Sequence, residues 1–85
     1  MSNRTPVGKV LHFFTKISVA VIELSGTLKV GDRIEVEGPN TKLAQNVESM
    51  QIEHKPIQSA GKGQSVGMKL SGLAHEGDAV FKVGD

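Results

Sequence analysis

The segment from residue 26 to residue 38 constrains the fold of this 85-residue chain more than any other. It contains turn signals at Gly26 and at Gly31-Asp32, followed by strict alternation of apolar and charged residues from Ile34 to Glu37. In a strand, such alternation places the apolar side chains on one face and the charged side chains on the other. The segment therefore predicts a strand with one buried face, and with it a β fold.

Further β-strand patterns occupy most of the remaining sequence. They lie at residues 7–14, 17–24, 43–53, 66–70 and 79–83. Residues 43–53 also fit a helix face, but neither end carries helix caps, so we predict a strand with a bulge that ends at Lys55-Pro56. In the last strand we expect Phe81 and Val83 to point inward.

The strands and the turns between them predict an all-β architecture. About six short strands separated by glycine turns at intervals of about ten residues are typical of a small barrel or sandwich. We favour a closed barrel because closure leaves no long sheet edge exposed. The length allows one domain, since two cores within 85 residues would each be too small. We expect a flexible N-terminus over residues 1–6 and one barrel over residues 7–83.

Composition narrows the classes of function. Ten basic and nine acidic residues give a net charge of +1, so binding to nucleic acid would need a local basic patch. The absence of cysteine excludes thiolate nucleophiles and zinc sites built on sulfur. The longest apolar run, residues 19–22, is far shorter than a membrane span, and no signal peptide pattern precedes it. We therefore expect a cytoplasmic protein with no membrane partner.

No motif in the sequence carries catalytic or cofactor chemistry. Residues 61–65 (Gly-Lys-Gly-Gln-Ser) lack the spacing of a phosphate-binding P-loop and precede a strand, so we expect no GTP binding. The three histidines lie on separate segments without the pairing that begins a metal site. No serine has an adjacent activating base. Glu35 and Glu37 are read as a solvated strand face. We therefore predict no catalytic, metal or cofactor residues.

A binding surface has better support in the sequence. Phe13 and Phe14 are adjacent and must point to opposite faces of a strand, so only one can enter the core. An exposed Phe14 beside His12 and Lys16 could stack on a base and neutralise a phosphate. The alternative is that Phe14 packs under residues 43–46. Candidate contacts for RNA or a protein partner are His12, Phe14, Lys16, His54 and Lys55.

Two glycine-punctuated stretches resemble the second domain of translational GTPases such as elongation factor Tu. They are residues 26–38 and residues 63–72, the latter followed by Gly77-Asp78 and the strand at 79–83. The resemblance extends from about Val7 to Val83. It implies a six-stranded Greek-key barrel and a non-enzymatic binding domain linked to translation, with RNA or ribosomal components as partners.

A second group is more similar still. Residues 7–10, 17–21 and 45–54 resemble small stand-alone elongation-factor-like proteins, whose barrel also occurs at the C-terminus of collagenase-type peptidase homologues. This resemblance implies an alternative function, an adaptor that docks on a larger peptidase-like protein. The family's glycine-arginine-glycine loop is replaced by Phe14-Thr15-Lys16, so the aminoacyl-tRNA and GTPase-domain contacts near that loop do not carry over, and the sequence has no GTPase domain.

Overall fold

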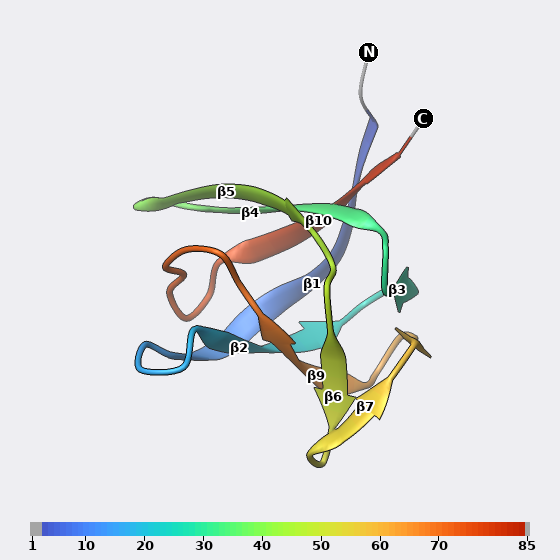
Figure 1. Cartoon of the computed structure of the whole chain (residues 1–85). Helices are drawn as coiled ribbons and strands as arrows, with labels where there is room; N and C mark the ends of the chain where they lie inside the picture. The colour runs from blue at the N-terminus through green and yellow to red at the C-terminus, as the bar shows by residue number, and fades with distance from the viewer. Residues whose placement is uncertain (1–2, 85) are drawn as a thin grey trace.

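The computed structural model describes residues 3–84 and confirms the all-β prediction (Figure 1). The strands are β1 (Asn3–Phe14), β2 (Val19–Leu24), β3 (Leu28–Lys29), β4 (Arg33–Gly38), β5 (Thr41–Asn46), β6 (Met50–Ile52), β7 (Lys55–Ile57), β8 (Ser59–Ala60), β9 (Ser65–Lys69) and β10 (Ala79–Gly84). Eight of them form one antiparallel sheet in the order β5-β4-β10-β1-β2-β9-β6-β7, and β3 pairs with β8. Residues 3–84 contain no helix, and so none that could span a membrane.

Strand β1 joins the two halves of the sheet. Its first part pairs with β10 from Asn3 to Lys9, and its second part pairs with β2 from Gly8 to Phe14. The register shifts between Pro6 and Gly8 and again between Val10 and His12. Such bulges bend a strand and increase its twist, which lets one strand serve both halves of a curled sheet.

Gly8 allows β1 and β2 to approach closely at this bend. A Cβ atom at Gly8 would lie 2.5 Å from the carbonyl oxygen of Glu23 and 2.9 Å from Ile22 Cγ2. No real side chain tolerates such distances, so the close pairing of the two strands requires glycine.

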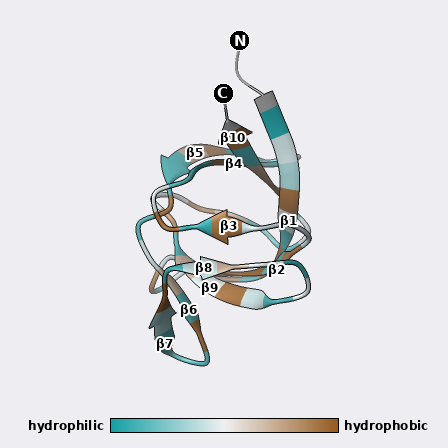
Figure 2. Cartoon of the chain, turned by 90° about the vertical axis from the view of Figure 1, so that its right-hand side faces the viewer, coloured by the Kyte–Doolittle hydropathy of each residue, from teal (hydrophilic) through white to brown (hydrophobic). Residues whose placement is uncertain are grey.

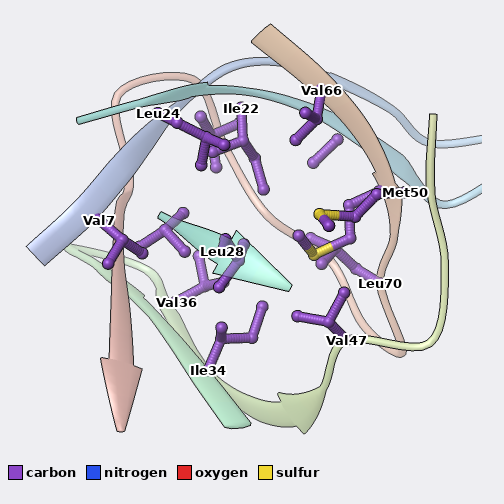
Figure 3. Close-up of a cluster of buried hydrophobic side chains, with 14 of the residues drawn as sticks. Val7, Ile22, Leu24, Leu28, Ile34, Val36, Val47, Met50, Val66 and Leu70 are labelled. Carbon is purple, nitrogen blue, oxygen red and sulfur yellow. The ribbon is translucent and has the colours of Figure 1, made fainter. Parts of the chain in front are cut away.

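A single apolar core lies inside the curled sheet (Figure 3). Ile34 and Val36 are fully buried in it, as the alternation in β4 predicts. Val66 and Met68 of β9 are buried in the same way. Figure 2 shows brown, hydrophobic segments on β1, β3 and β9. The other large side chains that are fully buried are Val10, Ile22, Leu28, Val47, Met50 and Val80. The period-two pattern of the sequence therefore identifies the core correctly.

A buried side chain links β5 to the end of β9. The edge strands of the sheet, β5 and β7, have no ladder between them within residues 3–84. Gln45 of β5 donates from Nε2 to the carbonyl oxygen of Lys69 at 3.0 Å, and its Oε1 accepts from the backbone N–H of Ser71 at 2.6 Å. This amide connects β5 to the end of β9 without backbone pairing.

Two predictions about segment ends are corrected by the strand pairing. Residues 1 and 2 of the predicted flexible stretch lie outside the described residues, whereas Asn3–Pro6 belong to β1 and pair with β10. Lys55 and Pro56 do not end the β structure, because β7 turns back and pairs with β6. Pro56 has no backbone N–H to donate to a second neighbouring strand, and β7 needs none because it lies at the edge of the sheet. Residues 43–53 form strands, as predicted, but they are divided between β5 and β6.

The predicted orientation of the last strand is wrong by one residue. Val80 is the fully buried side chain of β10 and lies opposite Val36 of β4, whereas Phe81 and Val83 are only partly buried. The register between β10 and β4 decides this outcome. Ala79 pairs with Glu37 and Val80 pairs with Val36, so Val80 shares the inward face of β4.

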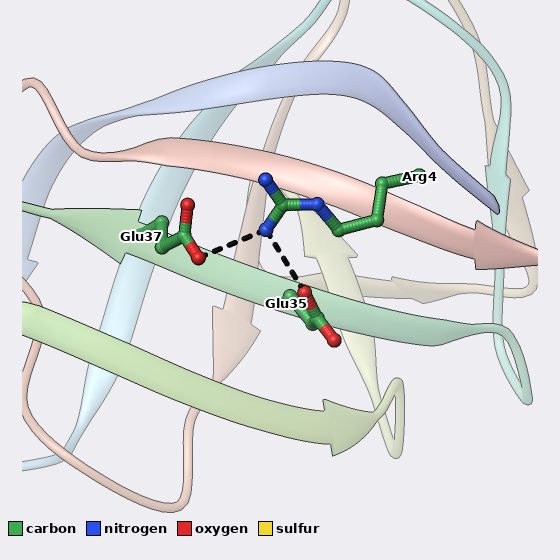
Figure 4. Close-up of polar contacts among 3 residues, drawn as sticks. All are labelled: Arg4, Glu35 and Glu37. Carbon is green, nitrogen blue, oxygen red and sulfur yellow. Dashed lines mark hydrogen bonds and ion pairs between the residues drawn. The ribbon is translucent and has the colours of Figure 1, made fainter. Parts of the chain in front are cut away.

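Phe81 instead lies under the side chain of Arg4 on the outer face of the sheet. The guanidinium carbon of Arg4 is 4.2 Å from the ring centroid of Phe81. Its Nη1 donates to Glu35 at 3.0 Å and to Glu37 at 2.9 Å (Figure 4). The hydrogen bond from Arg4 lowers the pKa of Glu37. The stability that this ion pair contributes is therefore present at neutral pH and is lost as the pH falls through the lowered pKa of Glu37.

Candidate binding groove

A groove of about 570 Å³ lies on the outer face of β2, β9 and β6. We call it the hairpin groove, because the β1–β2 turn forms one wall and the β6–β7 turn forms the other. Its lining residues are Phe14, Ile17, Val19, Val21, Ser49, Gln51, Glu53, His54, Ser65, Val66, Gly67 and Lys69. Exposed apolar side chains gather beside polar ones in this groove.

The first wall carries two exposed apolar side chains. Phe14 is 46% exposed and Ile17 is 59% exposed, at the end of β1 and in the turn that follows. Phe13 points the other way into the core and is only 9% exposed, as the opposite faces of a strand require. Phe14 is therefore the outward member of the pair and is not covered by residues 43–46.

His12 and Lys16 lie close to Phe14. The rings of His12 and Phe14 form an edge contact, with centroids 4.4 Å apart and planes inclined at 65°. His12 Nδ1 lies 2.9 Å from Glu76 Oε2. His12, Phe14, Lys16 and Ile17 also line an open hollow of about 390 Å³ that adjoins the groove at Phe14. An aromatic ring, an imidazole and an ammonium group thus share one corner of the surface.

The second wall is a strained two-residue turn. Ile52 pairs with Lys55, and between them Glu53 and His54 adopt φ values of 52° and 67°. Positive φ at both central residues characterises a type I′ hairpin, for which Asn-Gly is the usual sequence. Each L-residue with a side chain loses about 1–2 kcal/mol in this left-handed region. Backbone strain that a fold retains is concentrated at functional sites. Here the two strained residues, Glu53 and His54, line the groove.

Replacing the turn by its preferred sequence is expected to stabilise the fold. The double substitution Glu53→Asn and His54→Gly should raise the free energy of unfolding by about 1–2 kcal/mol, because Asn and Gly adopt positive φ at low cost. Urea denaturation measures the change. Asn40→Gly is the matched control at the tip of the β4–β5 hairpin, where φ is not positive, and it should give no gain. An unchanged or lower stability of the turn variant would contradict the strain argument.

The structure brings four of the five predicted contact residues together. Phe14 and His54 line the hairpin groove, and His12 and Lys16 line the hollow next to it. Lys55 follows His54 in β7 and is exposed, but it lines neither hollow.

Sequence reasoning missed the floor of the groove. Val19, Val21 and Gly67 point outward from β2 and β9, opposite the buried Ala20 and Met68. The sequence did contain a signal for this floor. Apolar residues occur on both faces of the strand predicted at residues 17–24, and an outward-facing pair of valines needs a cover or a ligand.

The lining of the groove combines apolar and polar side chains. Its floor is apolar, and its rim presents the hydroxyl and amide groups of Ser49, Ser65 and Gln51. Within residues 3–84, no three His, Asp or Glu side chains are grouped so that they could hold a metal ion. Apolar floors with a few polar rim groups are typical of ligand sites in proteins.

Comparison with known proteins places the chain in a family. Residues 19–85 match the family model described as elongation factor Tu domain 2. The chain belongs to this family. The resemblance in the two glycine-punctuated stretches is thereby confirmed.

Sequence relatives include both proteases and elongation factors. The chain is 47% identical over 76 residues to an uncharacterized protease of Methanocaldococcus jannaschii, covering 88% of this chain and 19% of that protein. It is 32% identical over 81 residues to a collagenase of Porphyromonas gingivalis, covering 93% and 22%. It is 42% identical over 45 residues to the selenocysteine-specific elongation factor of Mus musculus, covering 53% and 7%. The chain thus spans about a fifth of the length of the two protease relatives.

Solved structures share the fold. The C-terminal domain of a Geobacillus thermoleovorans protein assigned to the U32 peptidases superposes with a TM-score of 0.84 at 22% identity, covering 89% of each chain. Its selenomethionine variant gives 0.85 at 20% identity, covering 89% of this chain and 96% of that one. The arrangement of strands seen here is therefore also found at the C-terminus of a longer protein.

Proposed function

We propose that this chain is a non-enzymatic binding domain that holds single-stranded RNA in the hairpin groove. The observation that carries the proposal is the exposed ring of Phe14, which lines the groove and is flanked by His12 and Lys16. A base that stacks on such a ring contributes about 1–3 kcal/mol of binding free energy, and every base offers a face for stacking. The family match to a domain of translation factors gives this proposal its context.

Basic side chains around the groove supply contacts to phosphate. Lys69 lines the groove, Lys16 lines the hollow that adjoins it, and Lys55 follows His54 at the second wall. Glu53 is the acidic side chain of the lining and partly offsets them. Three lysines around an apolar floor provide positional contacts to an RNA backbone and no base-specific readout.

Binding of short RNA is expected to depend steeply on salt. With three phosphate contacts, the slope of log affinity against log salt is about −2, given about −0.7 per phosphate for single strands. The affinity should therefore fall about 20-fold when salt rises from about 50 to about 200 mM. Fluorescence anisotropy of a labelled short RNA measures both values.

Lysine variants test whether the salt dependence arises at the groove. Replacing Lys16, Lys55 and Lys69 by alanine should flatten the slope. Replacing the exposed Lys29 and Lys42, which lie neither in the groove or its adjoining hollow nor next in sequence to a lining residue, should leave it unchanged. Anisotropy that stays flat at every salt concentration would overturn the RNA proposal.

A protein–protein adaptor is the second candidate. Two observations favour it: the lining of the groove is mainly apolar, and the protease relatives carry the similar region as about a fifth of a longer chain. Under this proposal the chain docks on a larger peptidase-like protein. Co-purification with such a partner, together with the absence of RNA from the complex, supports the adaptor over the RNA-binding domain.

A further inference from the structure

The outer face of β4 and β10 places an aromatic ring beside two carboxylates. Phe81 of β10 pairs with Glu35 of β4, and Glu37 lies two residues further along the same strand. Glu35 and Glu37 face outward, because Ile34 and Val36 of β4 are fully buried in the core. No residue of β4 or β10 lines the hairpin groove, so this cluster is a separate part of the surface.

The side chain of Arg4 occupies this cluster (Figure 4). Arg4 belongs to β1 and pairs with Val83, so its side chain reaches across β10 to the carboxylates of β4. Its guanidinium carbon lies 4.2 Å from the centroid of the Phe81 ring, and its Nη1 donates to the two carboxylates at 3.0 and 2.9 Å. An aromatic face and carboxylate acceptors are the groups that recognise a guanidinium. The cluster is therefore complementary to an arginine side chain.

The segment that holds Arg4 in this position is paired on one side only. Asn3–Pro6 pair with β10, whereas the pairing of β1 with β2 begins at Gly8. A chain end that has one neighbouring strand opens at a lower free energy than a strand between two neighbours. The first core residue of β1 is Val7, so Arg4 can leave the cluster without exposing the core.

The two carboxylates decide which class of partner fits. They attract a cationic group and repel phosphate, so the backbone of RNA is unsuited to this face. Lys42 pairs with Glu37 from β5 and offsets part of the negative charge. A lysine ammonium supplies a positive charge but lacks the planar shape that stacks on Phe81 while it donates to two acceptors. The group that fits is an arginine of a protein.

An open hollow beside the cluster gives room for the chain that flanks such an arginine. Its volume is about 570 Å³. Phe81 and Glu37 belong to its lining, together with Ala79 and Pro39. Apolar side chains next to a charged rim suit the neighbouring residues of an extended peptide.

We propose that Phe81, Glu35 and Glu37 form a docking site for an arginine of a protein partner, and that Arg4 fills this site when no partner is bound. The inference goes beyond the proposed function and is independent of it, because none of the three residues lines the hairpin groove. Arg4 is tethered beside the site at an effective concentration in the millimolar range, so the partner needs further contacts in the hollow to displace it.

Removing Arg4 tests whether the site accepts a second guanidinium. Arg4→Ala should bind N-acetyl-arginine amide about tenfold more tightly than the unsubstituted chain does, because the tethered competitor is gone. N-acetyl-lysine amide should bind this variant at least about threefold more weakly than the arginine compound. Chemical-shift titration of the backbone amides of β4 and β10 measures each affinity. Arg33→Ala is the matched control: Arg33 is exposed on β4 but points to Asn46, so its removal should not improve binding.

A second carboxylate variant tests whether the named acceptors hold the ligand. Arg4→Ala combined with Glu37→Gln should bind the arginine compound about fivefold more weakly than Arg4→Ala alone, because a charged acceptor is lost without a change in shape. Both variants should unfold at urea concentrations close to each other. A capped pentapeptide with a central arginine between valines should bind Arg4→Ala more tightly than the single amino acid amide, because it also reaches the hollow.

The outcomes separate this inference from the proposed function. If Arg4→Ala binds the arginine compound no more tightly than the unsubstituted chain, or binds lysine equally well, there is no arginine site. If the pentapeptide gains nothing over the amide, the hollow is not part of a docking surface and the inference fails. If a short RNA shifts the amides of β4 and β10 in Arg4→Ala, the site takes RNA and the protein partner is ruled out. Absence of RNA binding at the hairpin groove removes the proposed function only.

Discussion

Phe14→Ala is expected to weaken RNA binding by about 5- to 150-fold, the equivalent of the 1–3 kcal/mol that one stacked base contributes. The side chain is 46% exposed and lines both the hairpin groove and the hollow shared with His12 and Lys16. Truncating it removes the stacking surface and also the partner of the His12 ring. Adding Lys16→Ala should weaken binding further by removing a phosphate contact.

The Phe14→Ala variant should lose less stability than a variant truncated in the core, because 46% of Phe14 is already exposed in the folded chain. Leu73→Ala is the matched control, since Leu73 is an exposed apolar residue that does not line the groove, and this change should leave RNA affinity unaltered. Anisotropy titration at about 50 mM salt compares the three proteins under conditions in which binding is strongest. Equal affinities for all three would clear Phe14 of any role in binding.

Phe13→Ala, by contrast, is expected to act on the fold and to lower the free energy of unfolding by about 3–5 kcal/mol. Phe13 is only 9% exposed and belongs to the core cluster, opposite Ala20 of β2. Its removal leaves a cavity that a close-packed sheet cannot fill, and a domain of this size has few kcal/mol to lose. Urea unfolding followed by circular dichroism measures the loss.

The conservative variant Phe13→Leu keeps the prediction testable if the alanine variant fails to fold. It retains most of the buried volume and should cost less than half as much. If Phe13→Ala and Phe14→Ala lower stability equally, the assignment of inward and outward faces at the end of β1 is incorrect.

Much of the fold follows from patterns that are local in the sequence. Alternation in β4 and β9 identifies their buried faces because side chains of a strand point to opposite sides at every step. The adjacency of Phe13 and Phe14 likewise requires one ring to face outward, and the structure shows that it is Phe14. Glycine spacing identifies the family, which the match over residues 19–85 confirms.

Features that depend on pairing between distant strands were harder to predict. The inward residue of β10 is fixed by its register with β4, and a shift of one residue reverses both faces. The ordered start of β1 depends on β10, whose residues lie more than seventy positions away in the chain. Lys55 and Pro56 continue the sheet only because β6 is there to pair with them.

The sequence by itself indicated a β domain similar to elongation factor Tu domain 2, with two adjacent aromatic rings that must lie on opposite faces of a strand. Alternation and turn residues suffice for that because they act over a few neighbouring positions. Only the tertiary structure decided that Phe14 is exposed and that Phe14 and His54, forty residues apart, line one groove. Curling of the sheet brings the two hairpin turns together, and that curvature depends on bulges and strand register that no local pattern specifies.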